Sequence, residues 1–311
     1  MSDIISNESN TNWLFSLSLK RPVLVMLILF ILACLLKILD SFIFRLDELV
    51  GEAIFTKALG FVLVAVYVWA CGRKLRDIGF HTRFLGKALL IAAVSLISLY
   101  IIAFTAQMIV LRSTGEDASF VLSAIDPKTG MSGGLLFAIW LLVANLVNSA
   151  MEEGLFRGTM IRHFLIRFSG WGAIILQAGL FALWHMSWPA RNLLDGNASF
   201  GQAANEALVL LVGTSIAGVV YGYLYLKTDN LWSPFLAHTI NNGIFNVLFF
   251  RTNMGMQSGL EFGLFLAIFL IGHLLLIPVF RFASKRLEMP EVKPWGEFGE
   301  DDRDLTESVT P

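Results

Sequence analysis

Residues 133–158 read GGLLFAIWLLVANLVNSAMEEGLFRG, and this stretch decides the fold class. Residues 133–150 carry no charge and are mostly apolar, and a helix needs roughly 20 such residues to cross the hydrocarbon core of a bilayer. Glu152 and Glu153 follow directly. An ionisable side chain in hydrocarbon is costly unless it is paired or hydrated, so the two carboxylates point to a functional site as well as to a membrane helix.

The whole chain has the composition of a protein that crosses a membrane many times. Of its 311 residues, 56% are apolar and 15% are charged, and the mean hydropathy is +0.69. Apolar runs of spanning length predict about eight transmembrane helices, at residues 22–42, 53–72, 88–110, 134–151, 171–190, 206–226, 231–250 and 260–280. We therefore predict an all-α, multi-pass helical bundle integrated in the membrane.

The predicted helices divide the chain into five segments. They are a cytoplasmic N-terminal segment, three helices with their loops, a core of four helices, a last helix and an acidic, disordered cytoplasmic tail: residues 1–21, 22–133, 134–250, 251–283 and 284–311. Residues 152–168 are expected to continue the fourth helix. The outer loop at 187–205 contains Pro, Gly, Asn and Asp and is expected to be irregular.

The distribution of basic residues predicts the orientation, because Lys and Arg are enriched in cytoplasmic loops. With both termini in the cytoplasm, the inner segments hold 16 of the 23 basic residues: Lys20, Arg21, Arg73, Lys74, Arg76, Arg83, Lys87, Arg157, Arg162, Arg167, Lys227, Arg281, Lys285, Arg286, Lys293 and Arg303. The short loops suit a bacterial inner (plasma) membrane. The dispersed, nearly balanced charge, 23 basic against 24 acidic residues, argues against a nucleic-acid partner.

Polar residues recur at helical spacing inside the predicted core. Glu153 and Arg157 are four apart, which favours an ion pair on one helix face, and Glu152 then points about 100° away. The same spacing separates two further pairs, Phe181 with His185 and His238 with Asn242.

The depths of these side chains can be compared along the chain. Glu152 lies about 17 residues before the 169–170 turn and His185 about 15 after it, so the two stand at nearly one level. His238 is only about 8 residues after the 228–230 turn. For all three to meet, the hairpin of the fourth and fifth helices must extend about 12 Å further, or tilt.

Two kinds of chemistry fit these residues. A carboxylate beside neutral imidazoles can activate water as a general base, and imidazole and amide groups can stabilise an oxyanion. Alternatively, two histidines and a glutamate could hold Zn²⁺ with one position open for water. The chain has no HExxH, GxSxG or GxGD motif, which argues against other intramembrane hydrolase designs.

The order EExxxR, FxxxH and HxxxN resembles the pattern of the CAAX protease and bacteriocin-processing (CPBP) family, which is related to the type II CAAX prenyl endopeptidases. The residues that match are Glu152-Glu153-GLF-Arg157, Phe181-ALW-His185 and His238-TIN-Asn242, within roughly residues 134–250. The resemblance implies an intramembrane endopeptidase, a hydrolase whose active-site cavity opens towards the cytoplasm. The expected substrate is a peptide or a membrane-protein segment at the lipid bilayer, and its prenylation is left open.

The resemblance also implies residue roles. Glu152 would activate water with the help of His185, and Glu153 could share that role. His238 and Asn242 would stabilise the oxyanion, while Arg157 and Phe181 would orient the site. The family is called a metalloprotease family, so zinc held by Glu152, His185 and His238 stays an alternative.

Two functions of other classes compete with proteolysis. The same glutamate and histidines could form a proton or ion relay in an ion-coupled transporter. The chain could also be a non-catalytic membrane protein of the immunity or scaffold type. Lys57, early in the second predicted helix, is expected to extend its amine to the outer interface.

Overall fold

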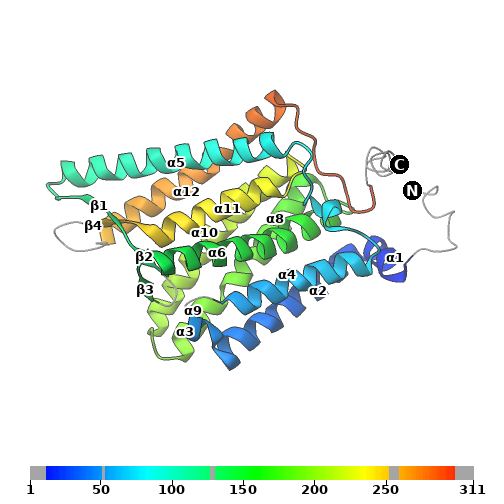
Figure 1. Cartoon of the computed structure of the whole chain (residues 1–311), viewed down its shortest axis with the longest axis horizontal. Helices are drawn as coiled ribbons and strands as arrows, with labels where there is room; N and C mark the ends of the chain where they lie inside the picture. The colour runs from blue at the N-terminus through cyan, green and yellow to red at the C-terminus, as the bar shows by residue number, and fades with distance from the viewer. Residues whose placement is uncertain (1–11, 51–52, 127–129, 252–258, 298–311) are drawn as a thin grey trace.

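The computed structural model is a bundle of long helices that run up and down a common direction (Figure 1). It describes residues 12–50, 53–126, 130–251 and 259–297. Its long helices each overlap one predicted span: α2 (Pro22–Ile38), α4 (Ile54–Ala70), α5 (Leu85–Ser113), α6 (Leu135–Glu152), α8 (Gly170–His185), α10 (Phe200–Leu226), α11 (Trp232–Val247) and α12 (Gly259–Arg286).

Shorter elements extend or connect these helices. The π-helix η1 (Leu39–Phe44) prolongs α2, and the π-helix η3 (Glu153–Ile161) with α7 (Arg162–Phe164) prolongs α6, so the predicted continuation of the fourth helix is present as far as residue 164. The other connecting elements are α1 (Trp13–Lys20), α3 (Leu46–Val50), η2 (Leu75–Ile78) and α9 (Ser187–Leu194).

The protein is an integral membrane protein. Within the described residues, 5 helical segments are long and apolar enough to cross a membrane, namely Pro22–Phe44, Leu85–Ser113, Leu135–Phe164, Phe200–Leu226 and Leu266–Arg286, and Ile54–Ala70 is a shorter apolar helix. Large apolar side chains such as Ile101, Ile102 and Leu275 are more than half exposed, as lipid contact requires. Eight membrane crossings remain a prediction.

The prediction of an all-α fold is incomplete, because four short strands are present. Strand β1 (Ser119–Leu122) pairs antiparallel with β4 (Leu248–Arg251), and β2 (Ala124–Ile125) pairs with β3 (Ser132–Gly133). The last residues of the predicted seventh helix are therefore β4. These segments are two to four residues long, which is too short for a periodic signal in the sequence.

The loop expected to be irregular at 187–205 is also largely helical. The helix α8 ends at His185, and α9 follows after a turn at Met186. Pro189 is compatible with α9 because it lies in the first turn, where a missing backbone N–H leaves no bond unmade.

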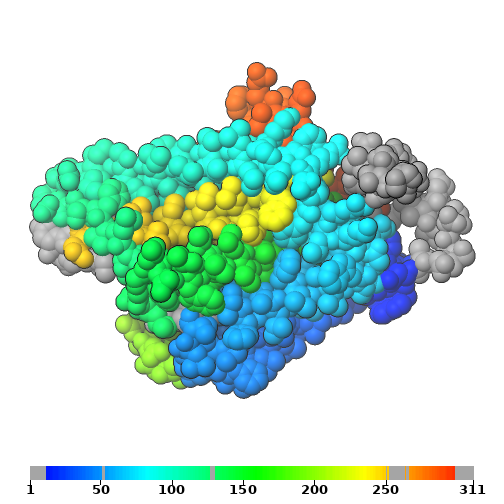
Figure 2. Space-filling model, viewed as in Figure 1, coloured from blue at the N-terminus to red at the C-terminus, as the bar shows by residue number. Residues whose placement is uncertain are grey.

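The bundle has two ends of different character, which Figure 1 shows at left and right. The strand end carries β1 to β4, α3 and α9. The terminal end carries α1 and residues 287–297. One face of the molecule is covered, from top to bottom in Figure 2, by α5, α11, α6 and the pair α4 and α2.

Part of the segment predicted to be a disordered tail is packed against the terminal end. The backbone N–H groups of Val292 and Trp295 donate to the carbonyls of Leu226 (3.0 Å) and Arg162 (2.9 Å). Trp295 is 1% exposed and its ring stacks on His163, with centroids 4.7 Å apart. The prediction of disorder is therefore wrong for residues 284–297, because burial of the Val292 and Trp295 side chains outweighs the acidic composition. Residues 298–311 lie outside the described part.

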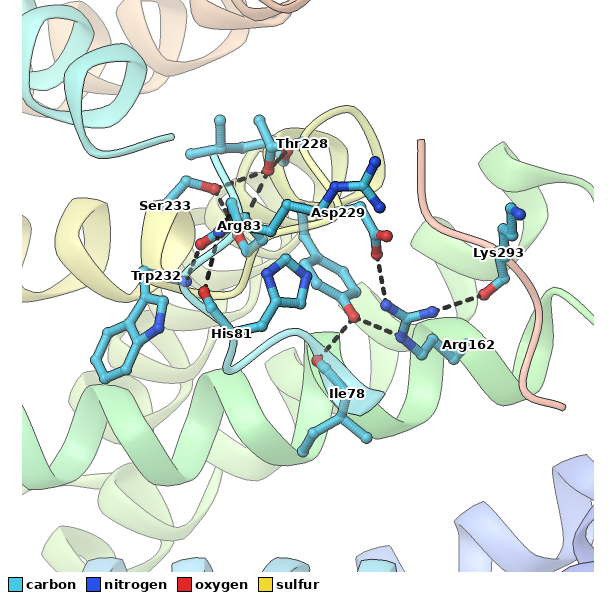
Figure 3. A network of polar contacts seen from close by, with 12 residues as sticks. Ile78, His81, Arg83, Arg162, Thr228, Asp229, Trp232, Ser233 and Lys293 are labelled. Carbon is cyan, nitrogen blue, oxygen red and sulfur yellow. Dashed lines mark hydrogen bonds and ion pairs between the residues drawn. The ribbon is translucent and has the colours of Figure 1, made fainter. Parts of the chain in front are cut away.

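A polar network centred on Arg162 fixes the loops of the terminal end (Figure 3). Arg162 donates to the Tyr225 hydroxyl (2.8 Å) and pairs with Asp229, and Tyr225 donates to the carbonyl of Ile78 (2.8 Å). Arg162 precedes Ser169 by seven residues yet contacts the 228–230 turn. The hairpin of α6 to α8 thus continues for several residues beyond the residue that contacts that turn, in the direction that the meeting of the site residues requires.

Candidate active site

A cavity of about 230 Å³ lies among α2, α4, α6, α8 and α11. Its lining consists of Lys37, Ala53, Thr56, Lys57, Asp126, Asn145, Asn148, Glu152, Trp184, His185, Trp188, His238, Asn242, Phe245 and Asn246. Four of the predicted catalytic residues are therefore brought together, although they come from three helices: Glu152, His185, His238 and Asn242.

The cavity extends from Glu152 towards the strand end. Ala53 precedes α4, Asp126 follows β2 and Trp188 lies in α9, and all three line the cavity and belong to that end. The terminal end is on the other side of the bundle (Figure 1). Cytoplasmic termini and a cavity open to the cytoplasm both stay predictions.

Glu152 ends α6 and presents two oxygens with different surroundings. Its Oε1 accepts a hydrogen bond from the indole Nε1 of Trp184 at 3.0 Å. Its Oε2 lies 3.6 Å from Nε2 of His238, which is beyond hydrogen-bond distance, and no described residue donates a hydrogen bond to it. The side chain is only 6% exposed, so one oxygen is held and the other is buried at the cavity without a donor.

Glu153 lies behind the cavity and is absent from its lining. Its Oε1 pairs with Arg157 at 3.1 Å, as the spacing predicts, and also accepts from Nδ1 of His238 at 2.7 Å. Both partners of the Glu153–Arg157 pair are fully buried. Loss of one partner in such a pair leaves an uncompensated charge, so Glu153 and Arg157 form a fixed support for His238.

The π-helix explains why two adjacent carboxylates reach the same imidazole. α6 passes into η3 at Glu153, and every residue of η3 is buried. In a regular α-helix, neighbouring side chains diverge by about 100°. Here Glu152 approaches Nε2 of His238 and Glu153 holds Nδ1, so the two carboxylates flank one ring. π-Helical turns occur often at functional sites.

Phe181 packs the site from behind. Its ring lies edge-on to His185, with centroids 4.7 Å apart, and the Arg157 guanidinium sits 4.2 Å from its centroid. The hydrogen bonds of the two histidines then indicate their tautomers. Nδ1 of His185 faces the carbonyl of Phe181 at 2.8 Å, and a carbonyl only accepts, so Nδ1 carries the proton.

The same reasoning applies to His238. Its Nδ1 faces Glu153 Oε1, a carboxylate oxygen that also forms an ion pair with Arg157, so Nδ1 of His238 is the donor. In their neutral forms, both rings therefore present the unprotonated Nε2 to the rest of the site. A neutral His238 accepts through Nε2 and cannot donate to an oxyanion, in contrast to the role implied by the resemblance.

One family model matches part of the chain. Residues 134–244 match the family model for the Type II CAAX prenyl endopeptidase Rce1-like domain. Residues 134–244 form a domain of the CPBP family. No curated protein and no solved structure matches the chain. The CPBP domain begins just before α6 and ends within α11, so it contains Glu152, His185, His238 and Asn242 but not α2 or α4.

Three cavity residues that were not predicted as site residues complete the site: Lys37, Lys57 and Trp184. Lys37 and Lys57 lie outside the CPBP domain, on α2 and α4, and are 6% and 5% exposed. Lys37 donates to the backbone carbonyl of Trp184 at 2.7 Å and sits 4.2 Å from its ring centroid. Both lysines attract the Glu152 carboxylate electrostatically. Lys57 thus lines the cavity, and its expected placement at the outer interface is wrong.

The donors of the CPBP domain do not form a zinc site. Across the described residues, no group of three His, Cys, Asp or Glu is arranged to hold a metal ion. Glu152 Oε2 and His238 Nε2, which lie 3.6 Å apart, share their cavity with two lysine side chains, whose charge repels a dication. The set Glu152, His185 and His238 therefore does not fit zinc, and no step below passes through a metal.

Proposed function

We propose that this protein is a membrane-embedded endopeptidase of the CAAX-protease type that hydrolyses a peptide bond near the membrane without a metal. The observation that carries the proposal is the state of Glu152. One of its oxygens is fixed by the Trp184 indole, and the other is buried at a cavity beside an imidazole with no donor bonded to it. A buried carboxylate oxygen in that state is suited to take a proton from water.

Water is activated between two acceptors. A water molecule in the cavity donates one proton towards Glu152 Oε2 and the other towards Nε2 of His185. Its oxygen attacks the carbonyl carbon of the scissile peptide bond while the proton moves to Glu152. Glu152 then returns this proton to the leaving amine, so the two products are a free carboxylate and a free amine.

The oxyanion that forms on the attacked carbonyl needs hydrogen-bond donors. The Asn242 side chain lines the cavity, and its Oδ1 accepts from Asn241 at 3.4 Å, which leaves the Asn242 amide nitrogen as a donor. His238 donates through Nε2 only when its ring carries a second proton. We therefore assign the oxyanion to Asn242 first and to protonated His238 second.

Glu153, Arg157 and Phe181 act as supports in this proposal. Glu153 does not line the cavity, and its oxygen is engaged by Arg157 and His238, so it orients His238 rather than sharing the base role. The substrate is a peptide or a segment of a membrane protein. The cavity volume of about 230 Å³ accommodates a few side chains, not a folded domain.

The test uses purified protein in lipid vesicles and a peptide library read by mass spectrometry. Wild type is expected to yield defined cleavage products, and Glu152→Gln, which keeps the shape and removes the base, is expected to yield none. His185→Ala and His238→Ala should also abolish cleavage, and Asn242→Ala should weaken it. The control is the thermal unfolding midpoint of each variant.

Full activity in all four variants would show that the site is assigned wrongly. Ion-coupled uptake that survives Glu152→Gln would favour a transporter of another design. A biological effect that persists in Glu152→Ala would favour the immunity or scaffold alternative.

A further inference from the structure

Asparagine side chains line the part of the cavity between Glu152 and the strand end. They come from two helices that lie side by side (Figure 2), and they are Asn145 and Asn148 on α6 and Asn242 and Asn246 on α11. Spacings of three and four residues place each set on one face of its helix. The cavity therefore has two polar walls that begin at the catalytic carboxylate.

Two contacts tie these walls together. The Asn145 amide donates to Asn246 Oδ1 at 2.8 Å, and the hydroxyls of Ser149 and Thr239 are 3.0 Å apart. Asn145 and Asn246 are thus engaged with each other. The separation of α6 and α11 is fixed on both sides of Asn148 along α6.

The Asn148 side chain differs from these neighbours. It is 5% exposed and lines the cavity, and no described residue forms a hydrogen bond with it. A side-chain amide carries two N–H donors and a carbonyl acceptor, and its burial without partners is costly. Asn148 therefore presents both a donor and an acceptor to whatever occupies the cavity.

A peptide that reaches Glu152 brings main-chain polar groups into a bundle that lies in the membrane. Each of its N–H and C=O groups needs a partner there, because bulk water is not at hand. Asn148 precedes Glu152 by four residues, or about 6 Å along α6, and an extended chain advances about 3.3 Å per residue. Asn148 thus lies level with a peptide group about two residues from the attacked carbonyl.

We propose that Asn148 binds the main chain of an extended substrate, its Oδ1 accepting from an N–H and its Nδ2 donating to a C=O about two residues from the scissile bond. The proposal rests on the proposed peptidase function and names the form of the substrate: an extended or unwound segment, held by its backbone. A helical segment bonds its backbone groups internally and offers none to Asn148. A membrane helix must therefore unwind locally before it is cleaved.

Backbone esters test this contact directly. Glu152→Gln protein, which lacks the base, is reconstituted in lipid vesicles, and the library peptide that it binds most tightly is selected. Each backbone N–H of that peptide is replaced in turn by an ester oxygen, which removes one donor and keeps the shape. A dansyl group on the peptide accepts energy from Trp184 and Trp188, which line the cavity, so its emission reports binding there.

We expect one ester, about two residues from the bond that the wild type cleaves, to raise Kd by about 2- to 12-fold, the range for one neutral hydrogen bond. The same ester should have no effect once Asn148→Ala is added, because its partner is already gone. Equal ester effects with and without Asn148 would overturn the proposal, and cleavage of the same peptide by the wild type would show that the peptidase function stands. Coupling to Asn148 in a peptide that the wild type does not cleave would keep the contact and count against the peptidase function. Failure of every library peptide to bind would overturn the proposal as well.

Asn145→Ala is the matched control, since it removes the same amide from the same wall, where Asn246 already engages it. It should lower the unfolding midpoint and keep the ester effect, whereas Asn148→Ala should keep the midpoint and lose the ester effect. With Glu152 intact, Asn148→Ala should raise KM by the same factor and leave kcat unchanged, as expected for a group that binds substrate and transition state equally. Loss of the ester effect in both variants would mean that the cavity has loosened as a whole, which would refute a specific contact.

Discussion

The substitution Trp184→Phe isolates the contact that orients the general base. Phe keeps an aromatic ring beneath the Lys37 amine and leaves the backbone carbonyl that Lys37 contacts, but it lacks the indole N–H that donates to Glu152 Oε1 at 3.0 Å. In this variant, no neutral donor among the described residues holds the Glu152 carboxylate. Its carboxylate is free to rotate, and the oxygen aimed at the cavity is no longer fixed.

The expected magnitude follows from the type of hydrogen bond. A hydrogen bond to a charged group contributes about 1.5–3 kcal/mol. Each 1.36 kcal/mol corresponds to a tenfold change in rate, so kcat should fall by about 10- to 150-fold. KM should change little, because Trp184 acts on the base and the substrate is bound by other cavity residues.

The chain offers a matched control at the terminal end. Trp295 is also buried, and its indole Nε1 donates to the Ser18 hydroxyl at 3.0 Å. Trp295→Phe removes the same kind of group far from the cavity and should lower the unfolding midpoint without lowering kcat. Steady-state peptide cleavage is measured for both variants per folded molecule. Equal kcat values in the two variants would refute the positioning role of Trp184.

Four further outcomes are expected. Gly218→Ala should lower the unfolding free energy by about 1–3 kcal/mol, because a Cβ there would lie 2.9 Å from Ala178 on α8, whereas Gly213→Ala on the same helix meets nothing within 4 Å and should be neutral in thermal unfolding. Tyr225→Phe removes the hydroxyl that joins Arg162 to the Ile78 carbonyl, so denaturation should show a loss of about 1–3 kcal/mol with kcat unchanged. A zinc chelator should leave peptide cleavage at its full rate; loss that zinc restores would contradict the metal-free proposal. Glu152→Gln should match or exceed the wild-type unfolding midpoint, and a fall of several degrees would mean that the carboxylate is there for stability.

The helices could be predicted from the sequence because lipid imposes their length and composition. Each long apolar run became one helix, and the errors lie at the boundaries, where lipid no longer dictates the conformation. β1 to β4 and α9 are short, and the strands depend on pairing between segments that can be far apart: the whole CPBP domain lies between β1 and β4. The packed segment near Trp295 was hidden by the acidic composition of its neighbours.

The site was predictable where its residues share a helix and not where they meet through the fold. The four-residue spacings drew attention to Glu152 and its neighbours in the chain, and also to His185, His238 and Asn242. Lys37 and Trp184 contact each other although 147 positions separate them in the sequence. Taken alone, neither residue stands out, because a lysine near the end of a membrane helix and an aromatic residue within one are both ordinary. Lys37, inside the run ACLLKIL, is nevertheless an ionisable group within an apolar run, and this is the signal in the sequence that points to it.

The two adjacent carboxylates have different roles because Glu152 lines the cavity and Glu153 does not, although one oxygen of each receives no hydrogen bond from a described residue. Glu153 is offset by Arg157 and by the N–H of His238, so its burial supports the fold. Glu152 receives one hydrogen bond from Trp184 and the attraction of two lysines, yet its Oε2 receives no hydrogen bond from any described residue. An unsatisfied buried polar atom costs about 1–3 kcal/mol. A scaffold would gain stability by losing that carboxylate, whereas a hydrolase needs an acceptor that no protein donor occupies. Because Glu152, unlike Glu153, places such an acceptor at the cavity, the arrangement argues for chemistry at Glu152.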